Sequence, residues 1–230
     1  MLMGGVAIFA FPSSWRLAPV PAADRGETVV LIHGMGRSWL SMLPLGRALR
    51  RDGYRVVLYG YPSTRYGLSD HAAKFATFLA TEVFPGAAPG TVHLVGHSLG
   101  GIVIRQALGE TPPPTVGRIV MLAPPNQGLR LAERLARWWI LRWLLQPLPE
   151  LSVAPDAAIQ RVPVPQAEIG IIAGCDDGKV DVAFTHLPGN IEAGHLVVPA
   201  CHSFLMNRHD VQAATAAFLR EGRFPDMRMK

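Results

Sequence analysis

An α/β fold with about six parallel strands flanked by helices is the architecture that this sequence predicts. Short β-branched runs recur along the chain, and segments of helical length separate them. The chain has 230 residues, of which 49% are hydrophobic and 17% are charged. That is enough to bury one substantial core but short for two, so we expect a single domain over residues 1–230.

The predicted strands and helices alternate from residue 27 onwards. A continuous apolar run between Gly26 and Gly34 suits a strand that is buried on both faces of a parallel sheet. Similar runs follow, each one before a segment with helical spacing of its apolar residues. The predicted strands are 27–32, 55–59, 91–95, 116–122, 169–173 and 196–198. The predicted helices are about 41–50, 68–82, 101–108 and 210–220.

The first eleven residues form an apolar segment that ends at Pro12. They lack the positively charged start of a signal peptide, and they are too short to span a bilayer. We expect an edge strand or an arm that docks on the core. A cytoplasmic protein is the simpler expectation, with a secreted one as the alternative.

Residues 125–163 interrupt the alternation and form a predicted helical cap or lid. The stretch 129–145 places Arg130, Arg134 and Arg137 on one helical face, and it holds three of the five tryptophans. The insertion leaves the carboxyl end of a strand, which is where open α/β sheets bind ligands. Trp138, Trp139 and Leu141 are therefore candidate substrate contacts, although the same side chains would also serve to pack the insertion onto the domain.

A glycine-flanked serine follows the predicted strand at 91–95 directly. The motif Gly96–His97–Ser98–Leu99–Gly100 is typical of a sharp strand-to-helix turn that exposes a nucleophilic hydroxyl. Such a turn strains the serine backbone, and residues without bulk are needed on either side of it. Ser98 is therefore the predicted nucleophile.

Serine chemistry also needs a base, and His202 is the best placed histidine. It lies between the last predicted strand and the last predicted helix, where a loop would bring it to the carboxyl edge of the sheet. His186 and His195 remain as alternatives.

The acid that would orient this base is expected at the end of the strand at 169–173. Asp176 and Asp177 are adjacent there, and only one of them can accept the imidazole hydrogen bond because neighbouring turn residues point in different directions. We favour Asp177, with Asp176 second and Asp181 third.

Backbone amides are the expected donors to an oxyanion, because they need no reorganisation as charge develops. Leu99 follows the nucleophile, and Met35 lies in the glycine-rich turn after the first clear strand. His33, in the same turn, is a candidate substrate contact. Neither of the common phosphate-binding glycine motifs is present, so no nucleotide cofactor is expected.

Charge and cysteine content restrict the expected partners. The net charge of +5 comes from scattered arginines, which does not favour a nucleic-acid role. The two cysteines do not form a metal-binding motif, and no metal or other cofactor is expected. We expect a small-molecule or lipid ester as substrate, with transient contact between the arginine-bearing helix and a lipid surface as a further hypothesis.

Six segments together resemble the α/β-hydrolase superfamily, and in particular small bacterial esterases and lipases of the triacylglycerol-lipase-like branch. They are VVLIHGMGRS (29–38), YPSTR (61–65), GHSLGG (96–101), MLAPPNQG (121–128), DGKV (177–180) and HSFLM (202–206). The resemblance implies an α/β-hydrolase fold, a triad of Ser98, Asp177 and His202, and oxyanion donors at Met35 and Leu99. The link between Ala173 and Asp177 is shorter than in many similar proteins.

The resemblance also raises the question of a disulfide. Related lipases carry a bridge near the acid and base loops, where this chain has Cys175 and Cys201. A bridge and two reduced thiols are both open alternatives.

Hydrolysis of carboxylic esters through an acyl-enzyme on Ser98 is the function that these residues predict. An acyltransferase or a thioesterase would use the same residues. A binding protein without catalysis is a third alternative, because a fold alone does not determine function.

Overall fold

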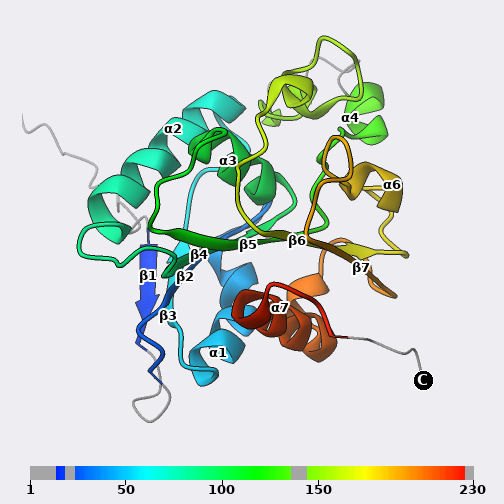
Figure 1. The fold of residues 1–230 in the computed structure, drawn as a ribbon. Helices are drawn as coiled ribbons and strands as arrows, with labels where there is room; N and C mark the ends of the chain where they lie inside the picture. The colour runs from blue at the N-terminus through cyan, green and yellow to red at the C-terminus, as the bar shows by residue number, and fades with distance from the viewer. Residues whose placement is uncertain (1–13, 19–23, 136–143, 226–230) are drawn as a thin grey trace, which may run out of the picture.

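The computed structural model describes residues 14–18, 24–135 and 144–225. Its centre is a seven-stranded sheet between two layers of helices (Figure 1). The strands are β1 (Ser14–Leu17), β2 (Thr28–Ile32), β3 (Arg55–Tyr59), β4 (Val92–His97), β5 (Val116–Leu122), β6 (Ile169–Gly174) and β7 (Gly194–Val198). The predicted segment 1–11 and the candidate contacts Trp138, Trp139 and Leu141 lie outside the described residues.

The sheet has the order β1-β3-β2-β4-β5-β6-β7. Strands β2 to β7 are all paired in parallel, which confirms the predicted α/β fold with about six parallel strands. The additional strand, β1, pairs antiparallel with β3 at the edge of the sheet. Its sequence, SWRL, is mostly exposed or half-buried and has no apolar run that would have predicted it.

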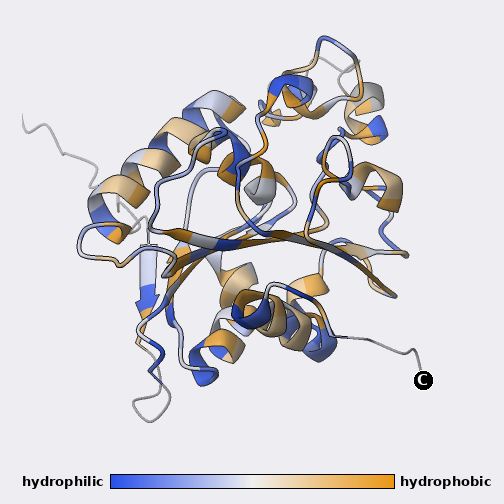
Figure 2. Cartoon of the chain, viewed as in Figure 1, coloured by the Kyte–Doolittle hydropathy of each residue, from blue (hydrophilic) through white to orange (hydrophobic). Residues whose placement is uncertain are grey.

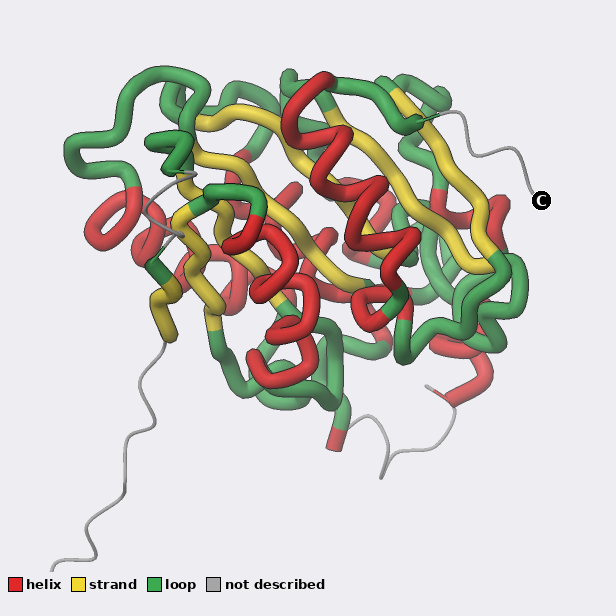
Figure 3. The backbone as a smooth tube through the Cα atoms, turned by 90° about the horizontal axis from the view of Figure 1, so that it is seen from below, coloured by secondary structure: helices red, strands yellow, loops and turns green. Residues whose placement is uncertain are grey.

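Helices cover both faces of the sheet. Helices α2 (Leu68–Phe78) and α3 (Leu99–Leu108) lie on one face, and α1 (Leu43–Arg51) and α7 (His209–Glu221) lie on the other (Figure 1). Figure 3, which views the molecule from below, shows the helices of that second face lying in front of the strands. The predicted helix 68–82 is divided, because its last turn, Leu79–Val83, is π-helical.

The core consists of two apolar clusters, one on each side of the sheet. Successive residues of β2 point to opposite faces, so that Val30 and Ile32 join one cluster while Val29 and Leu31 join the other. All four side chains are fully buried. This is why the central strands are apolar without alternation, as the colouring of the sheet in Figure 2 shows.

The segment between β5 and β6 contains the predicted insertion 125–163. Its described elements are α4 (Arg130–Leu135) and two short 3-10 turns, Pro149–Leu151 and Ala158–Arg161. The fully buried guanidinium of Arg105, on α3, donates to both oxygens of Asn126 and to the main-chain oxygens of Val162 and Pro163, over 2.6–3.3 Å. One side chain therefore holds the start and the end of the insertion together.

The second half of the insertion, around residues 146–150, is also attached to the loop before α2. Gln146 donates from its backbone amide to Thr64 and accepts from the amide of Tyr66, while the Glu150 carboxylate accepts from the amide of Leu68, at 2.8 Å. The last contact satisfies an amide at the start of α2 that has no partner within the helix. These contacts fix the segment beside the carboxyl ends of the central strands.

Candidate active site

Ser98 occupies a strained turn between β4 and α3. Its backbone has φ 53° and ψ −122°, in the region that residues other than glycine rarely adopt. Main-chain hydrogen bonds hold it there, from the Ser98 amide to Leu122 O at 2.8 Å and from the Gly101 amide to Ser98 O at 2.9 Å. Strain that is held in this way is found mostly at functional sites.

The two glycines of the motif are required by close backbone contacts. A Cβ atom at Gly96 would lie 2.5 Å from the backbone nitrogen of Gly101, and one at Gly100 would lie 2.6 Å from Ile32 O. Both distances are well below a normal contact, and backbone atoms cannot move aside as a flexible side chain can. The lack of space on both sides of Ser98 is what the motif predicts.

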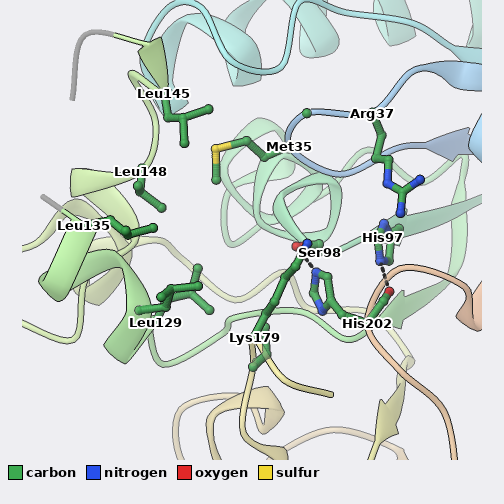
Figure 4. Close-up of a pocket in the computed structure, with 13 residues that line it drawn as sticks. Met35, Arg37, His97, Ser98, Leu129, Leu135, Leu145, Leu148, Lys179 and His202 are labelled. Atoms are coloured by element: carbon green, nitrogen blue, oxygen red, sulfur yellow. Dashed lines mark hydrogen bonds between the residues drawn. The ribbon is translucent and has the colours of Figure 1, made fainter. Parts of the chain in front are cut away.

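His202 and Asp177 continue a hydrogen-bonded chain from Ser98. The Ser98 Oγ atom lies 2.9 Å from His202 Nε2, and His202 Nδ1 lies 2.7 Å from Asp177 Oδ2 (Figure 4). When Nδ1 carries the proton and donates to the carboxylate, Nε2 is free to accept from the Ser98 hydroxyl. All three residues are buried, so water competes little for these hydrogen bonds.

Of the three candidate carboxylates, Asp177 is the one that contacts His202. Asp177 Oδ1 accepts from the amides of Lys179 and Val180, each at 2.9 Å, which leaves Oδ2 directed at His202. Burial alone would raise the pKa of this carboxyl, but the hydrogen bonds from His202 and the two amides hold that pKa below its ordinary value. Asp176 is exposed, and Asp181 precedes the short helix α6 (Val182–Thr185).

The two alternative histidines lie together, away from Ser98. The rings of His186 and His195 are stacked with their centroids 3.8 Å apart. His186 pairs with Glu192, and His195 Nε2 lies 2.8 Å from Thr185 Oγ1. Neither ring is among the residues that line the cavity beside Ser98.

His97 also participates in this arrangement, although the sequence did not predict a role for it. Its Nε2 donates to the main-chain oxygen of His202 over 2.9 Å (Figure 4). Burial lowers the pKa of His97 to about 3, so the ring stays neutral. The position of His97 beside the serine was the only sequence signal, and it does not reveal a partner more than a hundred residues away.

The expectation that His33 contacts substrate is corrected by its burial. Its side chain is fully buried, it stacks on Tyr61 at 4.5 Å between ring centroids, and it is absent from the lining of the cavity. Tyr61 donates from its amide to His33 Nε2 and from its hydroxyl to His33 O. His33 therefore stabilises the turn that carries Met35, and burial lowers its pKa to about 4.

A cavity of about 270 Å³ opens beside Ser98 and His202. One wall is apolar and comes mainly from the insertion, as Figure 4 shows on the side of Leu129, Leu135, Leu145 and Leu148. Met35 lines the same cavity from the turn after β2. Leu99 is the first residue of α3, where backbone amides have no partner within the helix.

In the described part of the chain, no group of three or more His, Cys, Asp or Glu side chains is arranged to hold a metal ion. None of the helices in residues 14–18, 24–135 and 144–225 is both long enough and apolar enough to cross a membrane. Cys175 and Cys201 are exposed free cysteines, so the structure has no bridge between them.

A mostly parallel sheet with a serine on a strained turn between a central strand and a helix is typical of one large class of hydrolases. The model of that class, the alpha/beta hydrolase family, matches residues 29–221. The chain therefore belongs to the alpha/beta hydrolase family, and the resemblance given by the six sequence segments is confirmed.

Among curated proteins, the chain is similar to one of Variovorax paradoxus (strain S110) that is named as a carbamate hydrolase, RutD. The two are 29% identical over 176 residues, which are 71% of this chain and 61% of the relative. The chain thus spans less than two thirds of the length of this relative.

Solved structures support the same fold. The mature form of the lipase BlEst2 from Bacillus licheniformis has a TM-score of 0.65 and 18% identity, over 90% of this chain and 96% of the lipase chain. In the propeptide form of the same lipase, the match spans 50% of that chain. A structure from Silicibacter sp. TM1040, described as a thioesterase, has a TM-score of 0.65 and 16% identity, over 90% and 80% of the two chains.

Proposed function

We propose that this protein is a serine carboxylic ester hydrolase of the esterase or lipase type. The observation that carries the proposal is the buried chain of hydrogen bonds from Ser98 through His202 to Asp177. It has the order of nucleophile, base and orienting acid that acyl transfer requires. Membership of the alpha/beta hydrolase family supports a hydrolase, and the triad and its mechanism are our inference.

In the proposed mechanism, Ser98 Oγ attacks the ester carbonyl while its proton moves to His202 Nε2. Asp177 holds the ring through Nδ1 and stabilises the imidazolium that forms. The amides of Met35 and Leu99 donate to the oxyanion of the tetrahedral intermediate. His202 then returns the proton to the leaving alcohol oxygen as the carbon–oxygen bond breaks, which leaves an acyl-enzyme on Ser98.

Water completes the reaction by the same steps in reverse. His202 takes a proton from a water molecule, the resulting hydroxide attacks the acyl carbonyl, and Ser98 is released with the proton returned to its oxygen. The buried Asp177 carboxylate remains ionised throughout, because its pKa lies below the ordinary value. Every step uses groups of this chain and water only.

The apolar wall of the cavity supports an apolar acyl group. Leu129, Leu135, Leu145 and Leu148 all come from the 125–163 segment, which we propose acts as a cap on a single α/β-hydrolase domain. Trp138, Trp139 and Leu141 stay predicted acyl contacts of the same cap. A cavity of about 270 Å³ is close to the lower end of ligand pockets, which favours short to medium acyl chains.

Thioester hydrolysis is the second candidate, since the fold is shared with a structure described as a thioesterase. The nucleophile, base and oxyanion donors would be the same, and only the leaving group would differ. Comparison of kcat/KM for an oxygen ester and a thioester with the same acyl group separates the two. Added alcohol, with analysis of the products, would reveal an acyltransferase as predominant transfer in place of hydrolysis.

The deciding experiment is hydrolysis of p-nitrophenyl esters from acetate to palmitate by the wild type and by Ser98→Ala. We expect Ser98→Ala to lower kcat by about 10⁴ to 10⁶ without loss of the folded state, as judged by circular dichroism. Ser41→Ala is the matched control, because the Ser41 hydroxyl donates to Ser38 O at the exposed surface and Ser41 does not line the cavity beside Ser98. Equal activity in Ser98→Ala and wild type, or no labelling of the wild type by a fluorophosphonate, would overturn the proposal.

A further inference from the structure

Two cationic side chains, Arg37 and Lys179, line the cavity that contains Ser98. Arg37 is half-buried and comes from the turn after β2, while Lys179 is exposed and comes from the turn after β6. Asp177, in the same turn as Lys179, is directed at His202 by its hydrogen bonds. The open space beside the nucleophile is therefore positively charged on one part of its wall and apolar on another.

Neither cation is neutralised by a carboxylate within the described residues. Many surface arginines of this chain do form ion pairs, among them Arg16 with Glu82, Arg55 with Asp24 and Arg118 with Glu168. Arg37 and Lys179, by contrast, have no carboxylate oxygen within 4.0 Å in the described part of the chain. Their positive charge is left for a ligand in the cavity.

The contacts of Arg37 hold it in place without using all of its donors. One guanidinium nitrogen, Nη2, donates to Ser203 O over 3.2 Å, and the guanidinium carbon lies 5.6 Å from the centre of the Phe204 ring. Both partners are in the loop that follows His202. A guanidinium has five N–H donors in a planar fork, so the remaining donors can bind a carboxylate or a phosphate.

The position of the two cations relative to the leucines indicates which part of an ester would carry the negative charge. In Figure 4 the leucines of the insertion and Arg37 lie on opposite sides of Ser98, and the Lys179 side chain extends toward Ser98 from below. An acyl chain against the leucines directs the alcohol part of the ester toward Arg37. The charge would then be on the alcohol.

We infer that the preferred substrates are esters of an apolar acyl group with an anionic alcohol, whose carboxylate or phosphate is bound by Arg37 and Lys179. This inference rests on the proposed ester hydrolysis at Ser98 and adds the substrate class. A charge-assisted hydrogen bond to a partly buried anion strengthens binding by about tenfold. A neutral ester of the same size lacks that contribution.

The test compares two esters of nearly the same size and shape, the anionic meta-carboxyphenyl butyrate and its neutral analogue meta-carbamoylphenyl butyrate. For the wild type we expect kcat/KM to be about tenfold higher for the anionic ester, mainly through a lower KM. We expect the ratio to fall in Arg37→Gln and in Lys179→Gln and to approach one in the double variant. Added salt should lower the ratio in the wild type, because it screens the charges.

Two further variants separate anion binding from other effects of these side chains. Arg51→Gln removes the same charge from the exposed end of α1, and we expect it to leave the ratio unchanged. Arg37→Lys keeps the charge without the planar fork, and we expect it to retain part of the ratio. If Arg37 only anchored the loop after His202, its replacement would slow both esters equally and the ratio would stay.

These measurements distinguish failure of the anionic substrate class from failure of ester hydrolysis itself. A wild-type ratio of about one, or a ratio that survives in the double variant, would overturn the anionic substrate class while leaving ester hydrolysis intact. Hydrolysis of neither ester would overturn both. The corresponding meta-phosphoryloxyphenyl butyrate serves as a third substrate, and a ratio higher or lower than that of the carboxylate identifies which anion is preferred.

Discussion

The Nε2 atom of His97 donates a hydrogen bond to the main-chain oxygen of His202, over 2.9 Å. His97, which precedes Ser98, thus contacts the backbone of His202, whose ring faces Ser98. The centroids of the two imidazole rings also lie 5.0 Å apart. Through this contact, the turn after β4 and the loop after β7 determine the position of His202 jointly.

Replacement of His97 by leucine should therefore reduce activity mainly through the position of His202, although the His97 ring also lines the cavity beside Ser98. We expect His97→Leu to lower kcat by roughly tenfold, since it deletes one hydrogen bond that positions the base. His97→Gln retains a donor near the place of Nε2 and should recover much of the loss. Because His97 is neutral down to a pKa of about 3, neither variant should move the acidic limb of the pH–rate profile. Wild-type kcat in His97→Leu would contradict this positioning role.

Buried neutral histidines should make the fold acid-sensitive. His33 and His97 have pKa values lowered by burial to about 4 and about 3, from an ordinary value of 6.5. Below pH 6.5 the unfolded chain takes up protons at these positions that the folded chain does not. Their stabilising contribution is therefore complete above pH 6.5 and is lost as the pH falls toward the folded-state values.

The expected slope is about 1.4 kcal/mol of unfolding free energy per pH unit for each such histidine. Urea denaturation at several pH values between about 7 and 4 measures it. His97→Gln should reduce the slope by the contribution of one histidine, about 1.4 kcal/mol per pH unit. An unfolding free energy that stays constant over this interval would contradict the assignment of both rings as neutral.

The buried guanidinium of Arg105 should stabilise the insertion. It donates only to neutral oxygens, at Asn126, Val162 and Pro163, and burial lowers its pKa to about 10. Arg105→Met keeps much of the apolar volume but leaves buried oxygens without donors, at a cost of about 2 kcal/mol or more. Arg50→Met is the matched control, because Arg50 donates to Ala18 O at the exposed surface. A similar change in both variants, measured by chemical denaturation, would refute a special role for Arg105.

Alanine at Gly100 should disrupt the turn that holds Ser98. The new Cβ would lie 2.6 Å from Ile32 O, so either the helix or the strand must shift, at roughly 1–3 kcal/mol. We expect lower stability and a large loss of esterase activity. Gly101→Ala is the control in the same helix turn, since its Cβ would meet Met121 and Pro124 at an ordinary 3.4 Å. Comparable activities of the two variants would show that this close approach does not constrain the site.

Local patterns in the sequence predicted much of the fold and of the candidate site. Apolar runs indicated the parallel strands because burial on both faces needs such runs, and β1 was missed because it is a short, half-exposed edge strand. Ser98, Asp177 and His202 follow predicted strands, so parallel topology brings them to one edge of the sheet. The roles of His97 and Arg105, and the burial of His33, depend on partners far along the chain, and no local pattern encodes them.

The Arg105 side chain binds both ends of the segment between Asn126 and Val162. This arrangement affects how much that segment can vary. With both ends held by Arg105, the distance between them does not depend on the chain that connects them. Closing a longer connection costs little additional entropy. The stretch in between can thus differ in length and sequence, which would reshape the wall of the cavity while the sheet stays as it is; only the contacts of Gln146 and Glu150 around the start of α2 would have to be made anew.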